Sequence, residues 1–227
     1  MTAFARKGVL LGVRTAIPVA LSVFAYGLVF GVLARQAGLP LFEALLMSGV
    51  VFAGSSQFVA MGLWTMPLPI GAIVLTTLVV NLRLVLLGAA LRPRFIGVAA
   101  RRIYPTLFFM ADENWALTLK YFEEGGDDAG FLLGSGLALY AAWLAATLVG
   151  SLASGAIPDP KRLGLDFAFV AVFLALLVGM WRGRSSILPW LCAALTAVLA
   201  QRLLPGTWYI LVGALAGTLV AVVRHAD

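Results

Sequence analysis

The sequence predicts an all-α membrane protein that crosses the bilayer several times and forms one integral membrane domain over residues 1–227. Hydrophobic residues make up 62% of the chain, charged residues only 11%, and the mean hydropathy is +1.02. These values lie far from the composition of a soluble domain. Apolar runs of about 20 residues, long enough to cross hydrocarbon as helices, follow one another with short connections. The alternating pattern of barrel strands is not found in the sequence, so helices are expected.

The first apolar segment, residues 15–34, follows Arg6, Lys7 and Arg14 as the core of a signal peptide would. It is longer than such a core and has no convincing small-residue cleavage site, so we interpret it as a retained span. The later segments cover residues 44–64, 68–91, 103–122, 129–151, 167–181, 187–203 and 207–223. A chain of 227 residues thus holds about seven or eight spans, with no room for a separate soluble domain.

Membrane topology explains the positive charge of the chain. The net charge is +6, and Lys and Arg gather at the ends of apolar segments, as the positive-inside rule describes. The expected surroundings are therefore a lipid bilayer, and nucleic acid is not an expected partner. Cys192, the only cysteine, lies in an apolar segment, which excludes an internal disulfide and favours a packing role. No cofactor and no metal site is expected.

Arginines after the third segment raise a question of topology. If every segment crosses and the N-terminus is cytoplasmic, four of them fall outside, against the positive-inside rule: Arg92, Arg94, Arg101 and Arg102. If segment 44–64 instead enters and leaves on one side, they move inside with Lys161 and Arg162, and the acidic loop Glu123–Asp128 moves outside. The interruption Gly54–Gln57 suits a broken or re-entrant helix, because such residues re-satisfy freed backbone groups. Both layouts are open at this point.

Small residues predict close helix contacts, and the segment plan indicates a weak repeat. Three glycine pairs, each spaced four apart, open flat faces for another helix: Gly27/Gly31, Gly130/Gly134 and Gly213/Gly217. The first and last thirds of the chain share a plan of three apolar segments, in which Gly31–Arg35 before Leu39-Pro40 resembles Gly179–Arg182 before Leu188-Pro189. Such a repeat would suit a secondary transporter with its site between two halves.

Polar residues at membrane depth mark the expected site. Ser55, Ser56 and Gln57 interrupt one uncharged run, and Asn81 and Arg83 stand in the next apolar segment. Hydrocarbon cannot hydrogen-bond to such groups, so each needs a protein partner or a water-filled cavity. On a continuous helix Asn81 and Arg83 point about 200° apart, so a break there is expected if both face one site. Freed N–H groups and Arg83 would bind a carboxylate, and freed carbonyls an ammonium group.

Two carboxylates supply the opposite charge. Asp112 and Glu113 follow the apolar run Leu107–Ala111, inside a segment expected to span the membrane. Either could hold an ammonium group or carry a coupling proton. The simpler alternative is that Arg83 pairs with one of them, so that both charges are neutralised and the role is structural. Such a pair would still leave a second carboxylate and two amide side chains to explain.

Five short runs occur in order along the chain: Phe30–Ala34, Phe52–Phe58, Asn81–Arg83, Asp112-Glu113 and Leu163–Phe167. In this combination the chain resembles the AzlC family. The resemblance implies the large subunit of a bacterial inner-membrane permease that works with a small membrane protein, AzlD, and exports branched-chain amino acids. Leu84 stands where many relatives carry a histidine, which excludes a proton relay through that residue, and Ala111 stands where a threonine often precedes the acidic pair.

We therefore expect a multi-pass inner-membrane transporter subunit, not an enzyme, that exports valine, leucine, isoleucine or a similar neutral amino acid. Substrate binding is expected at Ser55, Ser56, Gln57, Asn81 and Arg83, and ammonium binding or coupling at Asp112 and Glu113. The sequence has no Gly-x4-Gly-Lys-Ser/Thr loop for ATP, so an ion gradient is the expected driving force. Two other classes are open. One is an intramembrane serine hydrolase, whose base the terminal His225 is badly placed to supply, and the other is a passive channel.

Overall fold

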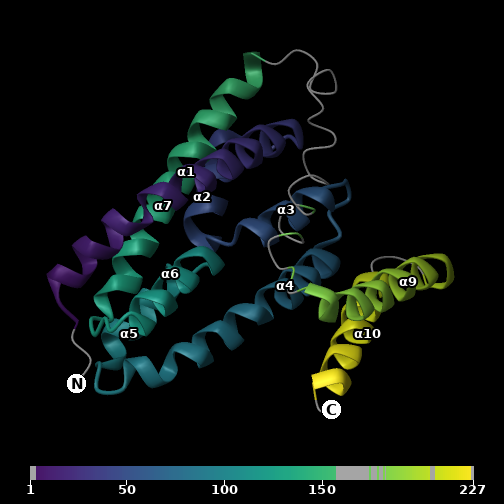
Figure 1. Ribbon diagram of the computed structural model, residues 1–227. Helices are drawn as coiled ribbons and strands as arrows, with labels where there is room; N and C mark the ends of the chain where they lie inside the picture. Colours follow the sequence, from purple (N-terminus) through teal and green to yellow (C-terminus); the bar gives the residue numbers. More distant parts are fainter. Residues whose placement is uncertain are drawn as a thin grey trace.

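The computed structural model describes residues 4–156, 183–204 and 208–225, together with Leu174, Val178 and Trp181, and these residues form helices and no strand. The α-helices are α1 (Arg6–Gln36), α2 (Leu41–Val51), α3 (Gly54–Gly62), α4 (Ile70–Leu91), α5 (Ala100–Phe108), α6 (Asp112–Glu123), α7 (Gly130–Ala153), α9 (Ile187–Leu203) and α10 (Trp208–His225). Short 3-10 turns lie at η1 (Arg92–Phe95), η2 (Ser154–Ala156) and η4 (Gly183–Ser186). The predicted all-α class is confirmed (Figure 1).

Among the described residues, four helices are long and apolar enough to cross a membrane: Arg6–Gln36, Ile70–Phe95, Gly130–Ala153 and Gly183–Leu203. Most of the predicted segment 167–181 lies outside the described residues, as do Lys161, Arg162 and the run Leu163–Phe167. Two of the other predicted segments, 44–64 and 103–122, are each divided into two short helices.

Helices α1 and α7 form the frame of the bundle, and they run in parallel. Gly8 lies beside Asp128 near the start of both helices, and Gly31 lies beside Thr147 near their ends. A β-carbon added at Gly134 would collide with the backbone carbonyl of Val9, and one added at Gly31 with that of Thr147. Glycines therefore let the two backbones touch, which confirms the predicted contact faces. The third predicted pair does the same between α10 and α9, where Gly213 and Gly217 lie against Ala197 and Ala193.

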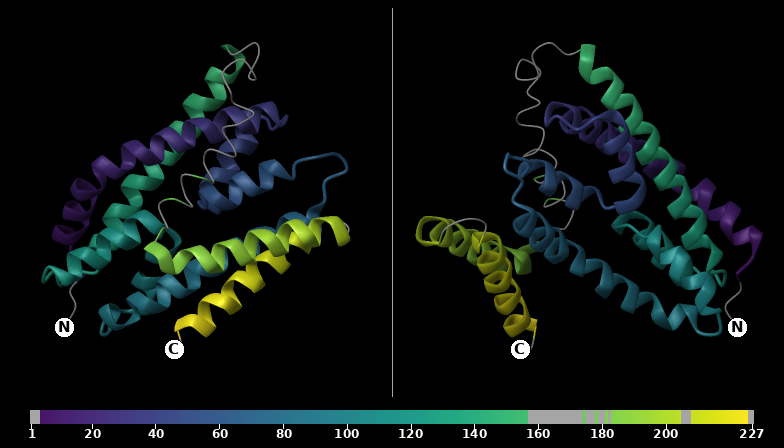
Figure 2. Two further views of the ribbon diagram at one scale, coloured as in Figure 1. Left: turned by 45° about the vertical axis from the view of Figure 1, so that its right-hand side comes forward. Right: turned by 180° about the vertical axis from the view of Figure 1, so that it is seen from behind.

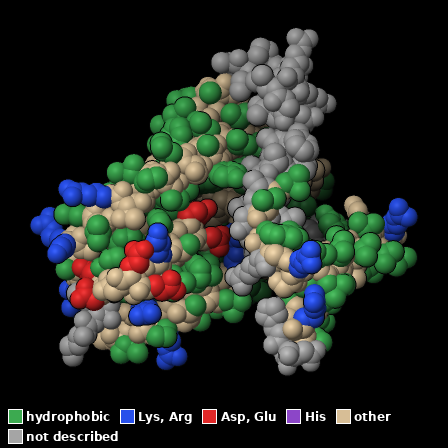
Figure 3. Space-filling view, viewed as in Figure 1, with side chains coloured by type: hydrophobic (Ala, Val, Ile, Leu, Met, Phe, Trp, Pro, Cys, Tyr) green, Lys and Arg blue, Asp and Glu red, His purple; other side chains and the backbone are tan. Residues whose placement is uncertain are grey.

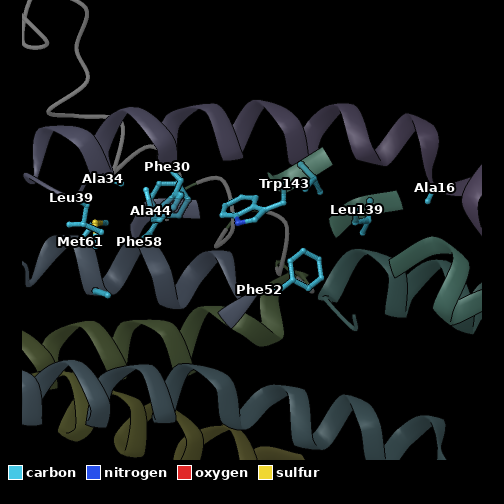
Figure 4. Packing of buried hydrophobic residues seen from close by; sticks show 12 residues of the cluster. Ala16, Phe30, Ala34, Leu39, Ala44, Phe52, Phe58, Met61, Leu139 and Trp143 are labelled. Atoms are coloured by element: carbon cyan, nitrogen blue, oxygen red, sulfur yellow. The ribbon is translucent and has the colours of Figure 1, made fainter. Parts of the chain in front are cut away.

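Aromatic rings fill the space beside this frame. The Phe30 ring of α1 stacks on Trp143 of α7 with centroids 5.7 Å apart, and it meets Phe58 of α3 edge-on at 6.0 Å. All three side chains are almost fully buried. Figure 4 shows them gathered beside α1, with Phe52 at the edge of the group. The core thus joins α1 and α7 to α3, a helix too short to cross the membrane alone.

Helices α2 and α3 enter and leave the bundle at the same end, the C-terminal end of α1. Arg35 Nη1 donates to the Leu39 carbonyl at 2.9 Å, which holds the start of the pair there. Met61, near the end of α3, packs in the same cluster as Ala34 and Leu39 (Figure 4). Between these points α2 follows α7 inward, with the Ser48 and Thr147 hydroxyls 2.9 Å apart. Segment 44–64 therefore has the re-entrant layout rather than the crossing one.

Helices α5 and α6 form a second re-entrant pair at the opposite end of the bundle. Arg102 Nη1, on the first turn of α5, donates to the Phe4 carbonyl at 3.3 Å. Beyond α6, the Asp128 carboxylate accepts the N–H groups of Ala5 and Gly8, both at 3.0 Å. The prediction that segment 103–122 spans the membrane is therefore wrong, because both of its ends lie beside the N-terminus of α1.

Under the re-entrant layout of segment 44–64, the acidic loop Glu123–Asp128 was expected on the outer side, opposite the arginine cluster, and this part of that layout is wrong. Helix α1 has no side-chain cap of its own, and Asp128 supplies one from a distant part of the chain. This contact holds the loop at the same end as the first residues of the protein.

The element order repeats with opposite direction through the bundle, but in different segments from those expected. Helix α1 is followed by the pair α2–α3, and α4, which runs back across the bundle, is followed by the pair α5–α6 (Figures 1 and 2). The end of α4 packs near the start of α1, since Leu91 and Phe95 share a cluster with Phe4. The expected repeat of the last third falls partly outside the described residues. Inverted repeats with broken helices are typical of secondary transporters.

The charges now agree with one orientation. In residues 4–156 the bundle end that contains the start of α1 carries most cationic side chains: Arg6, Lys7, Arg14, Arg92, Arg94, Arg101, Arg102 and Lys120. Apart from Arg83 at mid-depth, only Arg35 lies toward the other end in this range. Figure 3 shows Lys and Arg gathered where α1 begins. The positive-inside rule assigns this end to the cytoplasm.

Cysteine accessibility tests this topology. In a Cys192→Ala background, Ala99→Cys and Asp127→Cys should both be protected from an impermeant thiol reagent added outside, because both exposed positions lie at the α1 N-terminal end. Thr65→Cys, in the exposed loop after α3, should react. Labelling of Asp127→Cys together with protection of Ala99→Cys would contradict the second re-entrant pair.

A glycine substitution tests the frame. Gly134→Ala should lower the free energy of unfolding of the purified protein by about 1–3 kcal/mol. The added methyl group would collide with the Val9 backbone, which can shift only if α1 moves away from α7. Gly71→Ala, on α4, is the matched control, since nothing lies within 4 Å of the added carbon. Equal melting temperatures for the two variants in detergent would contradict the close α1–α7 contact.

Candidate substrate site between two broken helices

The break between α2 and α3 is held in a strained backbone conformation. Phe52, which is not a glycine, adopts a left-handed backbone with φ 40°. Its ring packs edge-on against Tyr140 at 5.0 Å, and the Tyr140 hydroxyl donates to the Gly49 carbonyl at 2.9 Å. These contacts fix the turn, so that α3 begins at Gly54 inside the bundle. The first N–H groups of a helix have no intrahelical acceptor and are available to a ligand.

The break between α5 and α6 is closed by one buried amide, Asn114. Its side-chain oxygen accepts the Ala111 N–H at 2.7 Å, and its side-chain nitrogen donates to the Phe109 carbonyl at 2.9 Å. Asn114 thus satisfies backbone groups on both sides of the break, and α6 begins with Asp112 at mid-depth. Asn114 is not among the site residues predicted from the sequence. One sequence signal could have indicated it. Asn114 is an amide residue two positions after Asp112, next to an apolar run, where its side chain can cap a new helix.

A cavity lies between the two breaks, with a volume of about 90 Å³. Its polar lining comes from Ser55 on α3, from Asn81 and Arg83 on α4, and from Asp112 and Glu113 on α6. Apolar walls complete it, with Val23, Tyr26, Phe52, Phe58, Leu84, Met110, Leu139 and Trp143. Five of the seven predicted site residues therefore meet in one cavity.

Arg83 is the electrostatic centre of the cavity. Its Nη2 lies 2.9 Å from Asp112 Oδ2 and donates to the Ser55 hydroxyl at 2.5 Å. The Arg83 and Asp112 side chains are 31% and 40% exposed, so the pair faces open space rather than packed core. Arg83 Nε is buried and has no hydrogen-bond partner among the described residues. Glu113 lines the same cavity and forms no ion pair with any Lys or Arg in the described part of the chain.

Helix α4 is continuous through the site, so the predicted break between Asn81 and Arg83 is wrong. Asn81 and Leu84 share the face that lines the cavity, and the long Arg83 side chain reaches it from the side. Asn81 also accepts a hydrogen bond from the Ser56 hydroxyl at 2.8 Å, which ties α3 to α4. Unwinding occurs instead at the tips of the two re-entrant pairs.

Gln57 lies behind the cavity wall rather than in the lining. Its Oε1 accepts the Trp143 indole N–H at 3.1 Å, and its Nε2 donates to the Ser48 hydroxyl at 3.1 Å. Ser48 in turn meets Thr147. The Gln57 side chain is fully buried. Gln57 therefore orients Trp143, one wall of the cavity, and joins α2, α3 and α7.

The serine contacts bear on the hydrolase alternative. Ser55 accepts a hydrogen bond from Arg83, a cation that cannot act as a general base, and Ser56 donates to the Asn81 amide. Neither described contact offers the base that a nucleophilic serine needs. The side chain of His225 lies outside the described residues.

An element order that repeats in opposite direction, with broken helices and a polar cavity between the breaks, is the arrangement typical of one class, the helical membrane transporters. The comparisons with known proteins identify the family within this class. The family model described as AzlC protein matches residues 18–157. The chain belongs to the AzlC family, which confirms the resemblance of the short runs. Its role is membrane transport.

Relatives extend over most of the chain. An uncharacterised membrane protein of Archaeoglobus fulgidus is 31% identical over 81% of this chain and 78% of its own length. The branched-chain amino acid transport protein AzlC of Bacillus subtilis is 27% identical over 74% of this chain and 67% of its own length. The inner membrane protein YgaZ of Escherichia coli is 24% identical over 94% and 89% of the two chains. No solved structure matches this chain.

The role of Gln57 gives a stability prediction. Gln57→Met keeps a similar volume but leaves the Trp143 N–H buried and unpaired, which should cost about 1–3 kcal/mol. Thr77→Val is the control, because that partly buried hydroxyl bonds only to its own helix backbone. A clear drop in the melting temperature is expected for Gln57→Met alone. An unchanged melting temperature of Gln57→Met would mean that the Gln57 hydrogen bonds do not hold Trp143 in place.

Proposed function

We propose that this protein exports branched-chain or similar neutral amino acids across a bacterial cytoplasmic membrane. The observation that carries the proposal is a cavity with a cationic side, an anionic side and apolar walls. A neutral amino acid is a zwitterion with an apolar side chain, and it needs these three surroundings together. Ion-gradient coupling and a small AzlD-like membrane partner complete the proposal.

The carboxylate of the substrate binds at the start of α3. There the freed N–H groups of Gly54 and Ser55 combine with the positive end of the helix dipole. Arg83 lies at the same point, in contact with the Ser55 hydroxyl. Its planar fork can take a carboxylate through two parallel hydrogen bonds, if it exchanges Asp112 for the substrate.

The ammonium group binds at the start of α6. Asp112 is engaged by Arg83, whereas Glu113 lines the cavity without such a partner, so Glu113 is the first candidate for the ammonium group. When the substrate carboxylate takes Arg83, Asp112 is released and either carboxylate can bind the coupling ion. The aliphatic side chain then lies against Leu139 and Trp143 on α7.

Two observations support the finer parts of the proposal. The Bacillus subtilis relative is named a branched-chain amino acid transport protein, and the motif resemblance implies export with a small partner. The sequence has no ATP-binding loop, which favours a gradient.

Counterflow in proteoliposomes is the direct test. Vesicles that contain the purified protein and are preloaded with unlabelled leucine should accumulate labelled leucine, and addition of the small partner should raise the rate. Preloading with a neutral sugar is the control. No accumulation with or without the partner would contradict amino-acid transport, and single-channel currents would favour the passive alternative.

Arg83 variants separate substrate binding from simple charge neutralisation. Arg83→Lys keeps the charge but loses the planar fork, so we expect normal assembly and a leucine affinity weakened about tenfold or more. The double variant Arg83→Leu with Asp112→Leu removes both charges together. If the two charges serve only to neutralise each other, the protein should tolerate this change. Recovery of both assembly and transport in this double variant would show that the two charges only neutralise each other.

A further inference from the structure

A second, larger hollow lies outside the candidate substrate site, between the end of α4 and α5. Its volume is about 400 Å³. The described residues that line it are Gly88, Ala89, Arg92, Phe95, Ile96, Ala100, Ile103, Tyr104 and Leu107. None of them lines the substrate cavity. We call this hollow the α4–α5 groove.

Small residues make the α4–α5 groove, and apolar residues form its walls. Gly88, Ala89 and Ala100 leave its floor open, and a β-carbon added at Gly88 would meet only Met110, at 3.7 Å. Because α4 ends and α5 begins at the α1 N-terminal end, Arg92 marks the mouth of the groove. Gly88 and Leu107 lie deeper toward mid-membrane. An extended hydrocarbon chain fits such a path.

The mouth of the α4–α5 groove is cationic. Arg92 is the only charged residue among the described lining, and it is exposed. Neither Arg92 nor the neighbouring Arg101 has an acidic partner in the part of the chain that the structure describes. The acidic residues at this end are partly engaged elsewhere: Asp128 caps α1, and Glu124 lies 3.7 Å from Lys120. The exposed phenol of Tyr104 adds a possible hydrogen-bond donor at the rim.

We propose that the α4–α5 groove binds an anionic phospholipid of the inner leaflet, with its phosphate at Arg92 and one acyl chain along the groove. Charge and position together favour this occupant. Arg92, which has no acidic partner among the described residues, attracts a lipid with net negative charge, whereas a zwitterionic headgroup carries its own counter-charge. The groove opens at the end that the positive-inside rule assigns to the cytoplasm, where anionic lipids give the membrane a negative surface. The site would hold the α4 end and α5 together, next to the second helix break.

Native mass spectrometry of the full-length protein tests the proposal without reference to transport. The delipidated protein in detergent is titrated with phosphatidylglycerol and with phosphatidylcholine of identical acyl chains. We expect about fivefold more retained phosphatidylglycerol, the effect of roughly one surface cation. Equal retention of both lipids would overturn the proposal.

Two variants and one control locate the lipid. Arg92→Gln should abolish the preference for phosphatidylglycerol, whereas Arg202→Gln, an exposed arginine on α9, should leave it unchanged. Ala100→Leu, at an exposed position, should fill the groove and reduce retention of both lipids severalfold. Melting temperatures check that the variants are folded. An unchanged preference in Arg92→Gln, or unchanged retention in Ala100→Leu, would place the lipid elsewhere and overturn the assignment.

Discussion

Backbone hydrogen bonding at membrane depth is the constraint on which this structure depends. Two helices stop inside the bundle, and the groups freed at each stop need partners that hydrocarbon cannot provide. At the second break Asn114 supplies them from its own helix. At the first, packing of Phe52 on Tyr140 holds the turn, and Gly54 and Ser55, at the start of α3, line the cavity. In the proposed function, the substrate binds the helix-start N–H groups that have no acceptor within their own helix.

The close contact of α1 and α7 makes room for these breaks. Because glycines let the two long helices touch, their other faces can hold the short helices α2, α3 and α6, which could not span the bilayer alone. Trp143 on α7 connects the frame to the site, since its ring stacks on Phe30, its N–H is held by Gln57, and its edge forms a wall of the cavity. Packing and binding thus share the same side chains.

Much of the fold and of the candidate site could be predicted from the sequence. The features that could not be predicted were missed for physical reasons. Hydropathy predicts the helical class, and uncompensated polar groups predict five of the residues that line the cavity, including Arg83 and Asp112. The break at Phe109–Ala111 was missed because its apolar residues resemble any span, and only the buried Asn114 side chain reveals it. The placement of loop 123–128 depends on Asp128 capping a helix over 120 residues earlier in the chain. No local pattern contains such a contact.

In the proposed function, one cavity recognises the carboxylate and the ammonium group of its substrate at two helix starts. Competition for bound labelled leucine tests it most directly, with 3-methylbutylamine, which lacks the carboxylate, and 4-methylpentanoate, which lacks the ammonium group. The competing affinity of each compound should be at least about tenfold lower than that of leucine, because a charge-assisted contact worth about 1.5–3 kcal/mol is lost. Competition by either compound as strong as that of leucine would contradict recognition of both charged groups.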